Sequence, residues 1–171
     1  HYLKAVTDNY AIVGEYKGTR CFQVELNTHK VQKVPVNIED VLSYDGDRIL
    51  YGTNKVLYEY SCDDKESTLL YKPEDTECRL VSACYMNNDI LFVYRWGDFK
   101  QNGTLFLHDR QTTRVFSADV PDNAVAVYWN ENVLLLVSAI WNSENYGNLH
   151  LYKIMPSGEA MEIILDENLP Y

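Results

Sequence analysis

One turn pattern occurs four times in this chain and constrains what the chain can fold into. The segments TDNYAIV, YDGDRIL, MNNDILF and WNENVLL, at 7–13, 44–50, 86–92 and 129–135, each combine a polar turn with an apolar strand start. Matching positions lie roughly 37, 42 and 43 residues apart, a repeat length typical of β-propeller blades. The repeats predict four blades, each a four-stranded antiparallel sheet, over approximately 2–37, 38–75, 76–120 and 121–171.

Strand-forming residues fill the segments between these turns. The chain of 171 residues includes 14 Tyr, and no segment longer than about ten residues shows sustained helical periodicity. Alternation is clear in two opposing rows, which are Cys21, Gln23 and Glu25 on one side and Phe22, Val24 and Leu26 on the other. We therefore expect an all-β domain. A β-sandwich or a closed barrel is the alternative, although neither would repeat the same four-part unit.

The charge of the chain limits its partners. A net charge of −10 argues against nucleic acid, because phosphate binding needs clustered Lys and Arg. An acidic protein attracts cationic partners instead. No window approaches the ~18 consecutive apolar residues of a transmembrane helix, and no signal peptide is visible, so no membrane partner is expected.

The four cysteines show no metal-binding or disulfide pattern. Cys78 and Cys84 lie on one predicted strand, about 20 Å apart, which is too far for a disulfide. The spacing leaves a Cys21–Cys62 disulfide open. There is no CxxC motif, so neither a zinc site nor another cofactor is predicted, and unpatterned cysteines favour an intracellular, cytoplasmic or nuclear location.

The third repeat resembles a WD-repeat blade. The resemblance is carried by LFLHDRQTTRVF at 105–116, where His108 and Asp109 stand in the place of the Trp-Asp pair that ends a third strand. Segments 149–164 and 21–34 are similar in outline. The Gly-His pair and the Trp-Asp pair of that family are intact in no repeat. The resemblance implies a divergent propeller, and such folds serve mostly as interaction platforms.

The repeat junctions carry a proline beside acidic residues. These acids include Glu39, Asp40, Glu74, Asp75 and Asp122. The end of the chain, DENLPY, resembles another junction of the same kind. Because the end blades of an open arc would leave apolar faces in water, we expect further blades or a homodimer to complete the ring.

Two long loops distinguish the third and fourth repeats from the first two. The connections between second and third strands are short in the first repeats, but they lengthen to RWGDFKQNG at 95–103 and AIWNSENYG at 139–147. Both contain a Trp, an acid and a later aromatic residue, which are Trp96, Asp98 and Phe99 in one loop and Trp141, Glu144 and Tyr146 in the other. In a propeller these loops and the blade junctions emerge on one face. Tryptophan and tyrosine are favoured binding anchors, so this face is the predicted partner-binding site.

Catalytic motifs are lacking in the sequence. There is no nucleophile elbow, phosphate-binding loop or zinc-protease motif. His108 and Asp109 could form a base and its orienting acid, but a structural role at the end of a strand is favoured. The segment Asp45-Gly46-Asp47 reads as a hairpin turn that needs a positive φ, not as an ion-binding loop. The sequence predicts a non-enzymatic module that binds a basic or amphipathic segment of a protein. A metal-dependent enzyme or glycan-binding propeller that uses the central channel is the alternative.

Overall fold

The fold is described from a computed structural model of the chain. The structure describes the backbone of residues 1–15, 19–75, 77–96, 103–111, 114–120, 124–130, 133–141, 147–154 and 160–163. It describes the side chains of residues 1–15, 19–75, 77–95, 104–111 and 127. The chain divides into two compact units, His1–Thr76 and Glu77–Tyr171. Each unit is described by itself.

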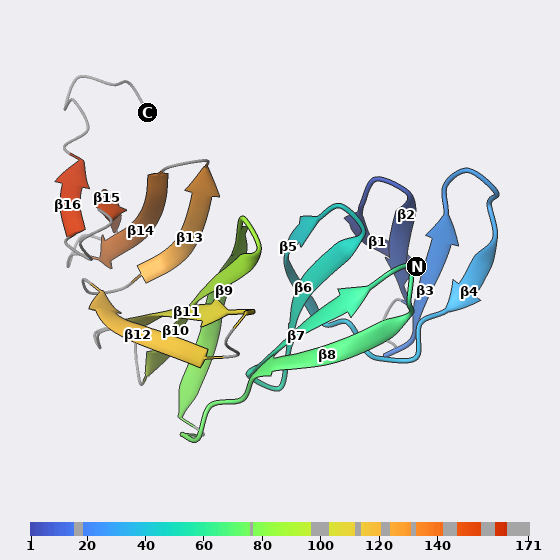
Figure 1. Cartoon of the computed structure of the whole chain (residues 1–171), viewed down its shortest axis with the longest axis horizontal. Coiled ribbons are helices and arrows are strands. Elements are labelled where there is room, and N and C mark those ends of the chain that lie inside the picture. Colours follow the sequence, from blue (N-terminus) through green and yellow to red (C-terminus); the bar gives the residue numbers. More distant parts are fainter. Residues whose placement is uncertain are drawn as a thin grey trace. The chain divides into compact units, whose positions relative to one another are not determined.

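The described residues form sixteen strands in four antiparallel sheets, and each sheet contains four strands in chain order (Figure 1). The first unit holds β1 (Tyr2–Val6), β2 (Tyr10–Gly14), β3 (Cys21–Glu25) and β4 (Val31–Lys33), followed by β5 (Asp40–Asp45), β6 (Arg48–Thr53), β7 (Val56–Ser61) and β8 (Glu66–Tyr71). The second holds β9 (Cys78–Met86), β10 (Asp89–Trp96), β11 (Gly103–Asp109) and β12 (Arg114–Val120), followed by β13 (Ala124–Asn130), β14 (Val133–Trp141), β15 (Gly147–Ile154) and β16 (Ala160–Ile163). Four strands joined in chain order are the predicted blade unit.

The hairpin register corrects the spacing of the repeats. The residues that open the second strand of each sheet are Tyr10, Arg48, Asp89 and Val133, which lie 38, 41 and 44 residues apart. The spacings predicted from the sequence, roughly 37, 42 and 43 residues, were therefore each wrong by one residue. The predicted hairpin turn at Asp45-Gly46-Asp47 is confirmed, since Gly46 takes the expected positive φ, +53°, between β5 and β6.

The two sheets of the first unit share one apolar core. Its most buried members come from both sheets and their connecting segments and include Ile12, Cys21, Ile38, Ile49 and Cys62, each at most 1% exposed. Burying one Ile side chain contributes about 1.5–3 kcal/mol, so these contacts dominate the attraction between the sheets. All four cysteines are free thiols, and the Cys21–Cys62 disulfide is not formed.

A buried amide joins the two sheets within this core. Gln23 of β3 is 4% exposed, and its Oε1 accepts a hydrogen bond of 2.9 Å from the hydroxyl of Tyr60. Its Nε2 donates a hydrogen bond of 2.9 Å to the backbone carbonyl of Cys62. Burial raises the pKa of Tyr60 to about 12, so the phenol keeps the proton that it donates to Gln23.

Asp47, in the turn between β5 and β6, binds the turn between β1 and β2 through hydrogen bonds, and we call these contacts the Asp47 clasp. One Asp47 carboxylate oxygen accepts hydrogen bonds from Thr7 Oγ1 at 2.8 Å and from the Asn9 amide at 3.1 Å, and the other accepts from Asn9 Nδ2 at 2.6 Å. Burial acts to raise the pKa of Asp47, but the hydrogen bonds from Asn9 and Thr7 outweigh it and hold that pKa below its ordinary value.

The second unit has a comparable core between its sheets. Cys84, Leu91, Val93 and Leu105 of the β9–β12 sheet pack with Val127 of β13, and Val127 is 1% exposed. Cys78 and Cys84 lie on the same strand, as the sequence predicted.

The bond between Gln23 and Tyr60 can be tested by a double-mutant cycle. Gln23→Ala leaves a buried hydroxyl and a buried carbonyl without partners, so we expect a loss of about 2–4 kcal/mol in the free energy of unfolding. Tyr60→Phe should cost about 1–2 kcal/mol, and the double variant less than the sum, because the second change removes a group already unpaired. Urea denaturation measures all three, with Gln32→Ala on β4 as the control. Strict additivity would contradict the bond.

The Asp47 clasp predicts a pH dependence of stability. A carboxylate whose pKa is lower in the folded chain stabilises the fold above its unfolded pKa of about 4, and this contribution is lost as the pH falls through the folded value. At pH 7 we expect Asp47→Asn to cost about 1–2 kcal/mol of unfolding free energy. Toward pH 2 the difference from wild type should shrink.

The neighbouring Asp45 supplies the control for this measurement. Asp45 forms an exposed ion pair with Arg48, so Asp45→Asn should change the unfolding free energy by less than about 1 kcal/mol. Equal effects of the two substitutions at every pH would show that Asp47 does not act as a clasp.

Candidate functional site

The described residues cover part of the predicted partner-binding face. Trp96 and Trp141 end strands β10 and β14, where their backbones pair with Cys78 and Gly147. Their side chains lie outside the described residues, as do Asp98, Phe99, Asp122, Glu144 and Tyr146. Glu39, Asp40, Glu74 and Asp75 are described, and all four are exposed.

Glu39 lies in the connection between the two sheets of the first unit. Its side chain accepts a hydrogen bond of 2.9 Å from Asn37 Nδ2, and its backbone carbonyl accepts one of 3.0 Å from Lys4 Nζ. The ammonium of Lys4 lies 5.1 Å from the centre of the Tyr2 ring. These contacts hold the connection in place and leave the Glu39 carboxylate exposed. Asp40 follows as the first residue of β5.

A groove of about 390 Å³ lies beside Glu39 within the first unit. It is lined by the connection between the sheets, by the β6–β7 turn and by one face of β6, β7 and β8. The lining residues are Val36, Asn37, Glu39, Tyr51, Thr53, Asn54, Tyr58 and Ser67. The connection and the β6–β7 turn emerge at the same end of the sheet, as the propeller plan predicted. We call this feature the tyrosine groove.

Two stacked tyrosine rings form the apolar part of the tyrosine groove. Tyr51 and Tyr58 are directly opposite in the β6–β7 register, and their ring centres lie 5.3 Å apart at an angle of 17°. The Tyr51 hydroxyl lies 2.6 Å from that of Ser67 on β8, and burial raises the pKa of Tyr51. Tyr51 is 2% exposed, whereas Tyr58 is half-buried and offers more of its surface.

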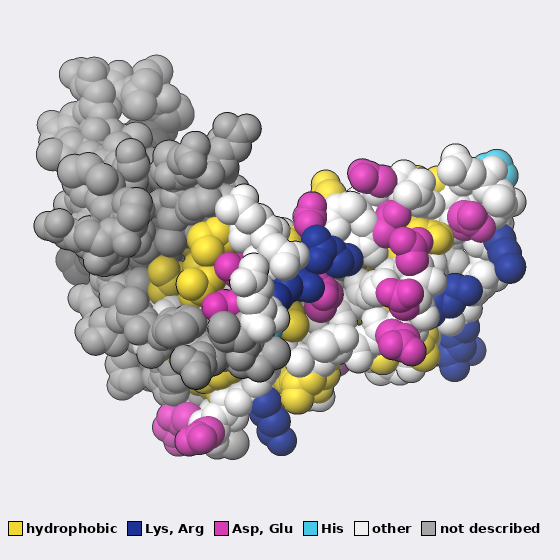
Figure 2. Space-filling model, viewed as in Figure 1, with side chains coloured by type: hydrophobic (Ala, Val, Ile, Leu, Met, Phe, Trp, Pro, Cys, Tyr) yellow, Lys and Arg dark blue, Asp and Glu magenta, His cyan; other side chains and the backbone are white. Residues whose placement is uncertain are grey.

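The rim of the tyrosine groove is set by a tight turn. Asn54 and Lys55 have φ values of +49° and +68° between β6 and β7. Positive φ at both central residues is the geometry of the hairpin turn that matches the twist of its strands, and asparagine adopts it readily. Figure 2 shows acidic and basic side chains interspersed over one face of the first unit. The carboxylate of Glu39 is the acid that lines the tyrosine groove.

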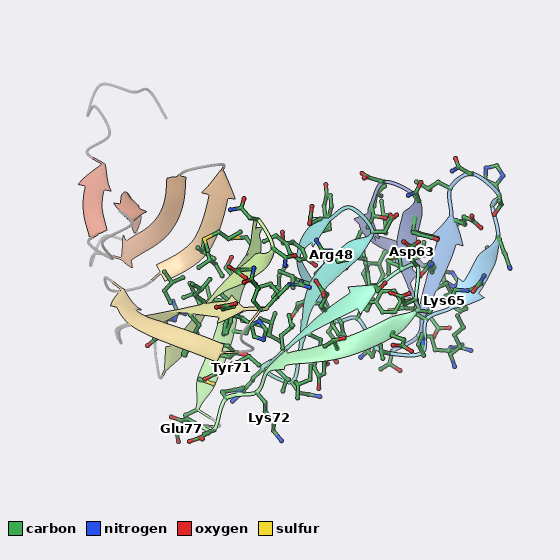
Figure 3. The ribbon with its side chains drawn as sticks, in the orientation of Figure 1. Arg48, Asp63, Lys65, Tyr71, Lys72 and Glu77 are labelled. Atoms are coloured by element: carbon green, nitrogen blue, oxygen red, sulfur yellow. The ribbon has the colours of Figure 1, made fainter. Side chains whose placement is uncertain are left out.

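A smaller hollow of about 160 Å³ lies at the opposite end of the strands. It is lined by Tyr10, Gln23, Glu25, Lys30, Gln32, Asp63 and Lys65, and Figure 3 labels Asp63 and Lys65 beside β3 and β4. Tyr10 donates a hydrogen bond of 2.9 Å to Asp63, and this bond raises the pKa of Tyr10 to about 12. Both acidic and basic side chains line this hollow, so it does not favour a ligand of one particular charge.

Three residues that the sequence raised for catalysis or ion binding lie in the described part of the chain: His108, Asp109 and Asp47. Asp109 accepts a hydrogen bond of 2.8 Å from the Gln111 amide, and Nδ1 of His108 is buried without a hydrogen-bond partner. Asp109 therefore does not orient His108 through that atom. The Asp47 carboxylate is occupied by Thr7 and Asn9. Within the described part of the chain, no group of three His, Cys, Asp or Glu residues could hold an ion, and no helix has the length and apolarity to cross a membrane.

Sequence reasoning predicted the exposed acid of the tyrosine groove and missed its aromatic floor. Glu39 was a predicted site residue, while Tyr51, Tyr58, Asn54 and Ser67 were not. A signal for the tyrosines was present, since they are paired symmetrically around a short polar turn. Among 14 tyrosines in a strand-rich chain, that symmetry is easily overlooked.

Comparisons with known proteins find structures of similar fold. No protein family matches the chain, and no curated protein matches it by sequence. Among solved structures, it is similar to the acylaminoacyl peptidase of Pyrococcus horikoshii (TM-score 0.64, 10% identity, 95% of this chain) and to the extracellular domain of a putative one-component system from B. thetaiotaomicron (0.59, 12%, 94%). It is also similar to the dipeptidyl peptidase 4 of Porphyromonas gingivalis (0.59, 9%, 94%).

The matches cover only part of those proteins. This chain spans 32%, 22% and 30% of their respective lengths. At such low identity the likeness shows the fold alone, which is that of β-propeller domains. It does not single out WD-repeat propellers.

Proposed function

We propose that this chain is a non-enzymatic interaction module whose tyrosine groove binds a basic segment of a partner protein. The observation that carries the proposal is that the exposed Glu39 and the half-buried Tyr58 line the same groove. A carboxylate next to an aromatic face is suited to a guanidinium or ammonium group, which can pair with the acid and lie over the ring. The divergent likeness of the third repeat to WD-repeat blades agrees with such a role.

The polar groups of the tyrosine groove favour an extended peptide. Asn37, Thr53 and Asn54 bring amide and hydroxyl groups to its rim, and these can pair with the backbone of a bound segment. The net charge of −10 would steer a cationic segment toward the chain. The partner itself is defined only by this chemistry.

The proposal predicts binding that depends on the Glu39 charge. The probe is a fluorescein-labelled peptide of alternating Arg and Gly residues, titrated against the full chain by fluorescence anisotropy. Glu39→Gln keeps the shape and the backbone carbonyl that accepts from Lys4, so it should weaken binding roughly fivefold, and added salt should weaken the wild type further. Tyr58→Leu should also weaken binding, through loss of the ring.

Glu66→Gln is the matched control, because Glu66 is an exposed acid at the start of β8 outside the groove lining. A peptide of alternating Glu and Gly residues controls for charge. Equal affinities of the Glu39 and Glu66 variants, or equal binding of both peptides, would reject the tyrosine groove as the site.

The two long loops of the third and fourth repeats carry a separate proposal, which concerns the second unit alone. We infer that Trp96 and Trp141 add aromatic anchors for a partner, as their sequence context predicts. The double variant Trp96→Ala/Trp141→Ala should keep the far-ultraviolet circular dichroism spectrum of wild type and bind the Arg-Gly peptide at least about threefold more weakly. Unfolding of the double variant would instead identify the tryptophans as core residues.

A further inference from the structure

The outer strand of the second sheet, β8, forms one wall of the tyrosine groove. It is an edge strand, since the strands of that sheet have the order β5-β6-β7-β8 (Figure 1). Ser67 of β8 lines the groove, and its hydroxyl lies 2.6 Å from that of Tyr51. Leu69 is directly opposite Tyr58 in the β7–β8 register, so its side chain lies on the same face as the stacked rings. Leu69 is 55% exposed.

The turn between β7 and β8 fixes which backbone groups of this hairpin bond to each other. The Ser61 carbonyl accepts a hydrogen bond of 2.9 Å from the Lys65 amide, so the backbone groups of Ser61 point toward β8. The next amide, that of Cys62, donates in the other direction, to the Asp47 carbonyl at 2.9 Å. Glu66 is opposite Ser61 in the register, so these two residues form a hydrogen-bonded pair.

The alternation of the ladder then shows which backbone groups lie at the open edge of β8. Thr68, two residues after Glu66, bonds to β7, whereas Ser67 and Leu69 direct their N–H and C=O groups away from the sheet. Among the described residues, no backbone hydrogen bond outside the sheets involves β8. Ser67 and Leu69 therefore bring both outward backbone groups and groove-facing side chains to the same edge.

β8 is less protected against strand addition than the other outer strand of this unit. β4 has three residues and ends on Lys33, and short length and lysine both discourage further pairing at an edge. β8 has six residues, with neither lysine nor proline among them. A bulge at Leu70, between Leu69 and Tyr71, interrupts its register. The regular part of the edge that borders the tyrosine groove is thus Ser67–Leu69.

We propose that the basic segment binds the tyrosine groove as an added antiparallel strand on β8. The inference rests on the proposed function and names the form in which its ligand is bound. Antiparallel pairing continues the pattern of the sheet and is slightly more stable per residue than parallel pairing. The ligand residues opposite Ser67 and Leu69 exchange backbone hydrogen bonds with them.

The same ligand residues turn their side chains to the groove face, because directly paired residues share one face of a sheet. A long cationic side chain at such a position can lay its aliphatic stem on Leu69 and extend its charge toward the acid of the groove, Glu39. The alternating Arg-Gly peptide fits this arrangement, since every arginine of an extended strand lies on one face.

Backbone methylation of the Arg-Gly peptide tests the added strand. N-methylation of the arginine residues removes the amide donors that face β8, so the affinity should fall at least about tenfold. N-methylation of the glycine residues removes donors that face solvent, so the affinity should change by less than about twofold. Fluorescence anisotropy with the full chain measures both peptides. Equal affinities, or a larger loss on methylation of the glycines, would overturn the proposal.

Amide hydrogen exchange of the chain, resolved by residue with NMR, gives a second readout. Saturation with the unmethylated peptide should slow exchange at Ser67 and Leu69 at least about fivefold and leave Thr68, which already bonds to β7, unchanged. Leu69→Thr should weaken binding about threefold, through loss of the contact with the arginine stem. Val31→Thr on β4 is the matched control, because Val31 is 60% exposed and lies outside the groove lining. Equal binding by the two variants would contradict the contact with Leu69.

The added strand and the proposed function can fail separately. Binding that depends on Glu39 but shows no alternation in methylation or in hydrogen exchange would keep the tyrosine groove as the site and overturn the added strand alone. An unmethylated Arg-Gly peptide that does not bind the wild-type chain would overturn both.

Discussion

The arrangement of the first unit depends on one buried amide. Gln23 gives each of its polar atoms a partner on the neighbouring sheet, the Tyr60 hydroxyl and the Cys62 carbonyl. An apolar core tolerates small sliding movements, whereas a buried donor and acceptor must meet their partners in one register or lose a hydrogen bond each. Because Tyr58 and Tyr60 lie on the same face of β7, the amide that fixes Tyr60 also fixes the ring of the tyrosine groove. The scaffold and the candidate site are thus set by the same contact.

The sequence was sufficient for the repeat, the strands and the chemistry of the turns. It was insufficient for the exact spacing, because a cluster of polar residues does not reveal which two occupy the corner of a hairpin. Hydrogen bonds such as the one from the Thr7 amide to the Tyr10 carbonyl show which two residues form the corner. They shift the equivalent positions of neighbouring repeats by one residue from those that the sequence predicted. A shift of one residue in a strand exchanges its two faces, so the corrected register was needed before any face could be compared with another.

The candidate site was predicted in part for a related reason. The exposure of Glu39 follows from its place beside a proline-containing junction. The groove beside it requires Tyr51, Tyr58 and Ser67 from three strands, and only cross-strand pairing brings these together. As sequence, the tyrosines are simply good strand formers. The hydrogen bond between Tyr51 and Ser67 depends on a register that local residue patterns do not encode.

The alternating rows of β3 show why simple amphipathicity fails in this fold. The row with Phe22, Val24 and Leu26 is the more apolar, yet Cys21 and Gln23 of the other row are the more deeply buried. A sheet that is covered on one face only would bury its apolar row and expose its polar row. A propeller blade has a neighbour on each side, so both rows can face a sheet, and the neighbour that is present decides which row is buried. The second sheet covers Cys21 and Gln23 and satisfies the amide with Tyr60. Leu3 and Leu26 lie on the other side of the first sheet, and they are 61% and 39% exposed.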